Sequence, residues 1–261
     1  MIEYTFSYYD FEYFLLVFVR VSMFVFIAPF FSINNTPNSV RLGISLCISI
    51  LLYSALTPTV APTYQTITGY AFIVLKEAVV GALIGYGTVI CTTIVSLAGT
   101  IADMETGLSM VSLMDPTNNQ QSSITGVIYQ YAIILMLMAT GMYRYLVGAL
   151  SDTFLLIPIN GAIFHMDSLF ASMLQFLRDY IVIGFRICLP VFCVGMLLNA
   201  ILGVLAKIAP QMNMFVIGIQ LKVLAGLTAL TITATMLPGA ADFIFVQMKK
   251  MVVSFVESMM P

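Results

Sequence analysis

Residues 69–98 read GYAFIVLKEAVVGALIGYGTVICTTIVSLA, and this stretch decides the class of fold. As an α-helix it would be about 45 Å long, whereas the hydrocarbon core of a bilayer is about 30 Å thick. Further apolar segments lie at about 11–31, 41–57, 124–150, 168–206 and 213–237, followed by a mixed tail from 239. None of them alternates apolar and polar residues as a membrane β-barrel requires. The sequence therefore predicts an all-α membrane protein.

The composition supports this class. Of the 261 residues 61% are hydrophobic and 8% are charged, against about 25% charged in soluble domains. The net charge of -2 argues against a nucleic-acid partner and leaves membrane lipid as the expected surroundings. The four cysteines, Cys47, Cys91, Cys188 and Cys193, lie in apolar segments, and His165 is the one histidine. This pattern has no zinc or haem spacing, so we expect no metal and no other cofactor.

The apolar segments contain ionisable residues at positions where lipid would penalise them by several kcal/mol. These residues are Arg20, Lys76, Glu77, Arg144, Arg178 and Lys222. Two explanations are open. Either the charges line an ion path, or the helices pack mainly against protein and few of them contact lipid.

Gly81 and Gly85 form a small-xxx-small pair in the sequence GALIG. Two such residues lie on one helix face and let another backbone approach closely. The pair predicts helix packing, but the sequence does not identify the partner helix.

Residues 107–123, GLSMVSLMDPTNNQQSS, are too polar for a membrane span and carry a single charge. Gly107 allows a bend, and Asp115-Pro116 is a typical start of a turn. Met110 and Met114 would share one face of a helical turn, and methionine adapts to irregular surfaces. Residue types alone leave two interpretations open: an ordinary extramembrane loop, or the lining of a constriction that seals and yields.

Four passages resemble one known family. GTIADMETGLSMVSLMDP (99–116) and LAKIAPQMNMFVIGIQLKVLAGL (205–227) carry the resemblance most strongly, and PFFSINNTPNSVRLGIS (29–45) and KEAVVGALIGYG (76–87) add to it. Together they are similar to the FliR/SctT family, the R-type subunits of the type III secretion export gate. The Lys-x-x-Pro-Gln loop between two apolar segments is the most specific of these features. The resemblance covers essentially the whole chain and implies one domain, 1–261.

The resemblance implies a non-enzymatic subunit of a protein-export gate. Such subunits assemble with the P-type and Q-type proteins FliP and FliQ, with the switch protein FlhB, and with FlhA. Their kinked helical hairpins form a conical hetero-oligomeric shell through which unfolded flagellar export substrates pass. The expected location is the bacterial inner membrane at the flagellar basal body, with much of the gate on the periplasmic side. The six charges in apolar segments would then contact neighbouring subunits.

The resemblance also implies roles for two loops. The loop at 107–123 would be the pore plug, with these residues in it: Gly107, Met110, Val111, Leu113, Met114, Asp115 and Pro116. The loop at 205–213 would lie at the cytoplasmic mouth and contact the switch protein through Lys207, Pro210, Gln211 and Asn213.

Two other classes of function were weighed. A secondary transporter could use Lys222, Arg144 or Glu77 as ligands, but the sequence has no convincing internal repeat of the kind such proteins show. An intramembrane hydrolase could use Asp103 and Glu105, but residues two apart point to different sides of a helix.

Overall fold

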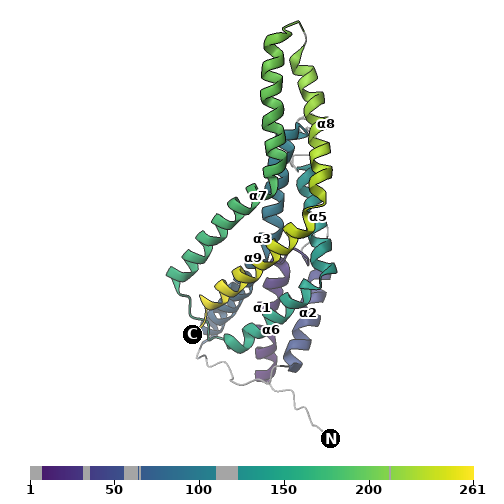
Figure 1. The fold of residues 1–261 in the computed structure, drawn as a ribbon. Helices are drawn as coiled ribbons and strands as arrows, with labels where there is room; N and C mark the ends of the chain where they lie inside the picture. Colours follow the sequence, from purple (N-terminus) through teal and green to yellow (C-terminus); the bar gives the residue numbers. More distant parts are fainter. Residues whose placement is uncertain (1–7, 32–35, 56–63, 65, 110–122, 212) are drawn as a thin grey trace. The chain divides into compact units, whose positions relative to one another are not determined.

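The computed structural model describes residues 8–31, 36–55, 64, 66–109, 123–211 and 213–261 (Figure 1). Within these ranges the chain is helical and has no strand, which confirms the all-α prediction. The helices are α1 (Tyr8–Ile27), α2 (Asn38–Ala55), α3 (Ile67–Thr106), α5 (Ile124–Ala139), α6 (Met142–Leu156), α7 (Met166–Ile208), α8 (Met214–Ala234) and α9 (Leu237–Glu257).

The chain forms two compact units. Unit 1 comprises residues 1–89, 141–175 and 247–261, and unit 2 comprises residues 90–140 and 176–246. Three helices, α3, α7 and α9, contribute residues to both units.

Unit 1 is built around α1. The buried residues of α1 include Leu16, Arg20 and Phe24, which recur every four residues and therefore form one helix face. α3 packs closely on this helix, because a Cβ atom at Gly81 would lie 2.1 Å from the carbonyl oxygen of Arg20. The structure thus identifies α1 as the helix on which the glycine pair packs, which the sequence alone did not identify. Gly85, one turn further along α3, faces Ile27 of the same helix.

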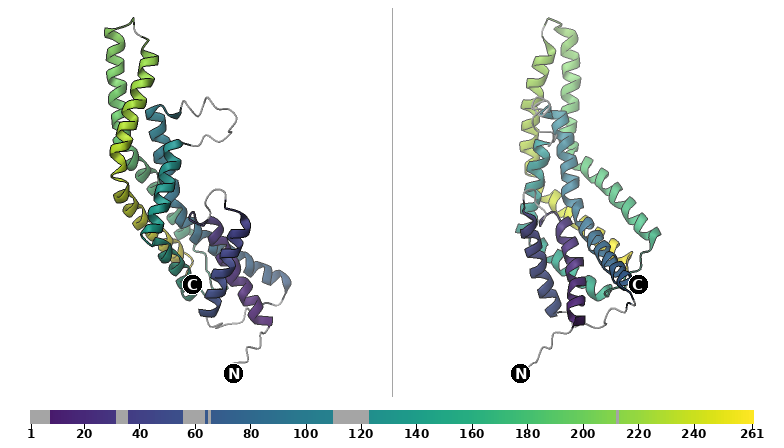
Figure 2. Two further views of the ribbon diagram at one scale, coloured as in Figure 1. Left: turned by 90° about the vertical axis from the view of Figure 1, so that its right-hand side faces the viewer. Right: turned by 180° about the vertical axis from the view of Figure 1, so that it is seen from behind.

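Unit 2 has a core of small side chains. Ala98 and Ala102 of α3 pack with Cys188 and Val191 of α7 and with Ala229 of α8. Small side chains let helix backbones approach, so three long helices share one narrow core. The second half of α7 runs antiparallel beside α8 (Figures 1 and 2).

Four helices are long and apolar enough to cross a membrane: α2, α3, α7 and α8. The pair α5 and α6 would make a fifth if the break between them lies within one span. Helices α1 and α9 do not meet this test of length and composition. One face of α1, which includes Leu16, Val17 and Phe24, is covered by protein in unit 1.

The structure differs from the sequence-based segments at two places. Segment 124–150 is two helices, because the chain breaks at Thr140 and Gly141, where Gly141 has φ +71. Glycine adopts this left-handed conformation without a steric penalty. The mixed tail from 239 is the regular helix α9, whose buried residues Ile244, Met248, Met251 and Phe255 follow the helical period.

Candidate functional site

The strongest candidate site is the base of the 107–123 loop, where Asp103 near the end of α3 meets the start of α5. The Asp103 side chain is 3% exposed. One carboxylate oxygen accepts a hydrogen bond from Ser123 Oγ at 2.7 Å. The backbone N–H and the hydroxyl of Thr125 also donate to this carboxylate, the N–H at 3.2 Å and 3.3 Å from its two oxygens. We call Asp103, Ser123 and Thr125 the neck, because they join the two chain segments that flank residues 110–122.

Ser123 connects the neck to the first turn of α5. Its Oγ accepts a hydrogen bond from the backbone N–H of Gly126 at 2.8 Å, so Ser123 is the N-cap of this helix. Serine is among the preferred N-cap residues because its oxygen satisfies an N–H group that lacks a partner in the first turn. A single hydroxyl therefore caps α5 and donates to Asp103.

The backbones of α3 and α5 touch one turn away from the neck. A Cβ atom at Gly99 would lie 2.2 Å from the backbone nitrogen and Cα of Gly126. No side chain larger than hydrogen fits there without movement of a helix. This contact places the carboxylate of Asp103 within hydrogen-bonding distance of Thr125.

α3 ends just beyond the neck. Gly107 has φ +79, the conformation that commonly ends a helix at glycine. Thr106 is 2% exposed and lies against Gly226 of α8. The end of α3 is therefore held from two sides, by α5 and by α8.

The other expected plug residues lie outside the residues that the structure describes. They are Met110, Val111, Leu113, Met114, Asp115 and Pro116. Their role as plug contacts stays a prediction, and of the plug residues Gly107 alone has a described conformation.

The expected cytoplasmic-mouth residues lie where α7 turns into α8. Lys207 is in the last turn of α7, Pro210 and Gln211 are in the connection, and Asn213 precedes α8. All four side chains are exposed. Their contact with a switch protein stays a prediction.

Two of the six charges in apolar segments meet inside unit 1. Arg20 Nε donates to Glu77 Oε2 at 2.6 Å, and both side chains are 0% exposed. Arg20 Nη1 donates to the carbonyl oxygens of Thr153 and Ile157, at 3.3 Å and 3.0 Å. Residues of unit 1 enclose this pair, and a contact of Arg20 or Glu77 with a neighbouring subunit stays a prediction.

A second layer of contacts surrounds the pair. Glu77 Oε1 accepts from the backbone N–H of Asn160 at 2.9 Å, and Lys76 Nζ donates to the carbonyl oxygen of the same residue at 2.7 Å. The Arg20 guanidinium also lies 4.3 Å from the ring centre of Phe154. This cluster ties α1 and α3 to the segment that follows α6.

The remaining charges are not brought together. Arg144 and Arg178 are exposed, and Arg144 donates a hydrogen bond to its neighbour Tyr143. Lys222 is half-buried in unit 2 and lines a small gap with Glu105. A contact of Arg144, Arg178 or Lys222 with another subunit stays a prediction.

Sequence reasoning did not find the role of Asp103. The sequence suggests a carboxylate pair of Asp103 and Glu105, whereas the structure places the Asp103 carboxylate in the neck and Glu105 beside Gly195 of α7. The signal that could have found it is Ser123, a polar residue directly before an apolar helical run. In the described part of the chain no group of three His, Cys, Asp or Glu residues is placed to hold a metal ion.

A model of the family described as bacterial export proteins, family 1, matches residues 11–248. The chain belongs to this family of bacterial export proteins. The match contains the neck, the Arg20–Glu77 pair and the α7–α8 connection. It confirms the resemblance that the sequence passages indicated.

Several proteins similar to this export protein are named flagellar biosynthetic protein FliR. The protein from Bacillus subtilis (strain 168) is 29% identical over 213 residues, which cover 80% of this chain and 81% of the relative. The protein from Aquifex aeolicus (strain VF5) is 27% identical over 237 residues, covering 88% and 90%. The protein from Escherichia coli (strain K12) is 25% identical over 229 residues, covering 86% and 84%.

Proposed function

We propose that this export protein is a non-enzymatic core subunit of the flagellar type III export gate and forms part of its protein-conducting passage. The observation that carries the proposal is the family match over residues 11–248 together with relatives named for flagellar biosynthesis that align over most of both chains. The four or five apolar helices fit a place in the bacterial inner membrane at the flagellar basal body.

The loop at 107–123 is, in this proposal, the plug of the passage. Support comes from the neck, because Asp103 ties together the two segments that flank residues 110–122. The neck therefore holds the two ends of the loop at one point. Its composition of Met, Asn, Gln and Ser suits a seal that closes and still lets polypeptide pass.

The proposed partners are FliP, FliQ, FlhB and FlhA, with unfolded flagellar export substrates passing through. The apolar helices are mostly exposed in the single chain. In the apolar 18-residue stretch of each helix, 17% of the residues are buried in α2 and in α8, and 28% in α7. This surface suits contact with lipid and with further subunits. The proposed contact with the switch protein consists of the exposed residues Lys207, Pro210, Gln211 and Asn213.

Deletion of residues 110–120 tests the plug. We expect the variant to co-purify with its partner subunits and to make the inner membrane leaky to small solutes, measured as dye entry and ion conductance. Cells that lack the whole gene are the matched control, because they have no gate and should not leak. Unchanged permeability of cells with an assembled variant complex contradicts the plug.

A further inference from the structure

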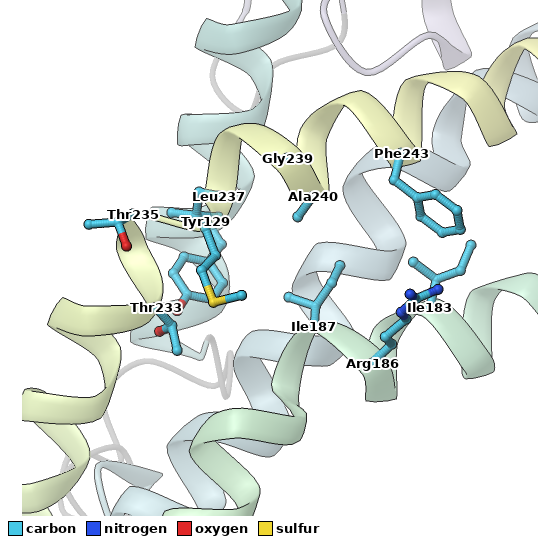
Figure 3. A pocket seen from close by; sticks show the side chains of 11 residues that line it. Tyr129, Ile183, Arg186, Ile187, Thr233, Thr235, Leu237, Gly239, Ala240 and Phe243 are labelled. Carbon is cyan, nitrogen blue, oxygen red and sulfur yellow. The ribbon is translucent and has the colours of Figure 1, made fainter.

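Unit 2 contains a cavity of about 560 Å³ where α8 ends and α9 begins (Figure 3). α5 contributes Tyr129, α7 contributes Arg186 and its neighbours, and α9 contributes its first two turns, including Phe243. Most of the lining is apolar, and the hydroxyl groups of Tyr129, Thr233 and Thr235 add polar atoms. A volume of several hundred Å³ is that of a typical small-molecule site.

Arg186 is the one charged residue in this lining. Its guanidinium lies 5.4 Å from the ring centre of Phe243, which holds it at the cavity. Among the described residues no carboxylate forms an ion pair with Arg186, and its side chain is exposed. A cation in an apolar wall without an anionic partner is costly in a membrane protein unless a ligand supplies the anion.

The distribution of charge along α7 places this arginine at the membrane surface. Residues 187–206 contain no Asp, Glu, Lys or Arg, and Arg186 and Lys207 flank them. A helix of this length rises about 30 Å, which is the thickness of the hydrocarbon core. α8 runs back beside α7, and its C-cap Thr235 lies at the same cavity as Arg186. With residues 187–206 as the span, Arg186 would lie at the level of lipid phosphate groups, at the opposite end from Lys207.

The surface beside the cavity is apolar and uncovered. Val182 and Leu189 lie about one turn on either side of Arg186 on the same helix face, and they are 56% and 54% exposed. A ligand with a phosphate at Arg186 would find hydrocarbon-binding surface directly next to it.

We propose that this cavity binds an anionic glycerophospholipid, with the phosphate on Arg186 and an acyl chain along the exposed face of α7. Basic pockets between membrane helices commonly bind lipid head groups in this way. The site is independent of the plug, because it shares no residue with the neck.

Lipid photo-labelling tests the proposal. The assembled complex is reconstituted in vesicles that contain a trace of phosphatidylglycerol or phosphatidylcholine with a diazirine in the acyl chain, and labelled peptides are mapped. We expect phosphatidylglycerol to label the α7 peptide around residues 182–190 several-fold more than phosphatidylcholine does. Arg186→Gln removes the charge-assisted hydrogen bond to the phosphate and should lower this labelling about tenfold. The cavity-filling Ala240→Phe should lower it as well, because it takes the space of the ligand. Lys250→Gln, an exposed cation of α9 outside the cavity, should leave it unchanged.

Two results would overturn the lipid site. One is labelling that does not distinguish the two lipids or does not respond to either cavity variant. The other is a protein adduct in place of lipid when a photo-reactive residue replaces Met236 in the cavity wall, since a helix of another subunit would then occupy the site.

Discussion

Replacing Asp103 by alanine should release the neck and leave the helices intact. The substitution removes the acceptor for three donors, one on Ser123 and two on Thr125. Ser123 keeps its cap on α5, because its Oγ still accepts from Gly126. The link between the end of α3 and the start of α5 is therefore the feature that is lost.

The size of the effect follows from the burial of the donors. Thr125 is 4% exposed, so its N–H and its hydroxyl have no ready access to water when Asp103 is removed. A hydrogen bond to a charged group contributes about 1.5–3 kcal/mol. Taking the lower value for each of the two donors of Thr125 gives about 3 kcal/mol. This corresponds to an increase of about a hundredfold in the fraction of molecules in which the Asp103–Thr125 link is open. Asp103→Asn keeps one acceptor oxygen and should show about a tenth of this increase.

Hydrogen exchange of the purified complex measures this opening directly. The amide of Thr125 should exchange about a hundredfold faster in Asp103→Ala, because local opening controls its protection. The amide of Gly126 keeps its hydrogen bond to Ser123 Oγ and should change less. Asp242→Asn is the matched control, since Asp242 is an exposed carboxylate of α9 in the same unit. Exchange at Thr125 that stays within about twofold of the native rate would refute the role of Asp103.

Two further predictions concern unit 1. Gly81→Ala places a Cβ atom 2.1 Å from the carbonyl oxygen of Arg20, so α1 must move and co-purification with partner subunits should fall. Gly203→Ala is the control, because the space around Gly203 is open and co-purification should not change. Equal recovery of partner subunits with both variants would contradict the close packing. Glu77→Gln leaves the buried charge of Arg20 uncompensated and should destabilise the fold by about 3 kcal/mol, seen as a lower melting temperature of the solubilised complex. Glu257→Gln, at an exposed position, is its control, and a melting temperature equal to the control's would count against the buried pair.

The long apolar segments were predictable from the sequence. Segment 69–98 lies within α3, segment 168–206 lies within α7, and segment 213–237 matches α8 to within a few residues. Length and hydropathy are local properties, so they identify a helix without knowledge of its neighbours. The ends of helices are less predictable, because capping contacts such as that of Ser123 decide them.

The break at Gly141 and the helix α9 were not predicted. Gly141 is a single glycine in an otherwise apolar run, and glycine within a helix is common enough that it does not identify a break. α9 carries Asp242, Lys249 and Lys250, which obscured the apolar period of the face that is buried. In both cases the local signal was ambiguous and tertiary packing decided the result.

The candidate site depends on contacts that local spacing does not show. Asp103 is bonded to residues 20 and 22 positions further along the chain, across the loop whose base they form. Arg20 and Glu77 are 57 positions apart, so the sequence showed two isolated charges and suggested contacts with other subunits. The sequence predicted that Gly81 and Gly85 form a packing surface, but only the three-dimensional structure identified α1 as the helix that packs there.

The central claim is that the loop tied by the neck lies in the path of exported polypeptide. A photo-reactive amino acid at Met114, in living cells with an export substrate stalled by a bulky folded tail, tests this most directly. The control is the same amino acid at Leu52, a buried position of α2. We expect a substrate adduct at Met114 and none at Leu52. Adducts at Met114 with partner subunits alone, and none with the stalled substrate, would contradict it.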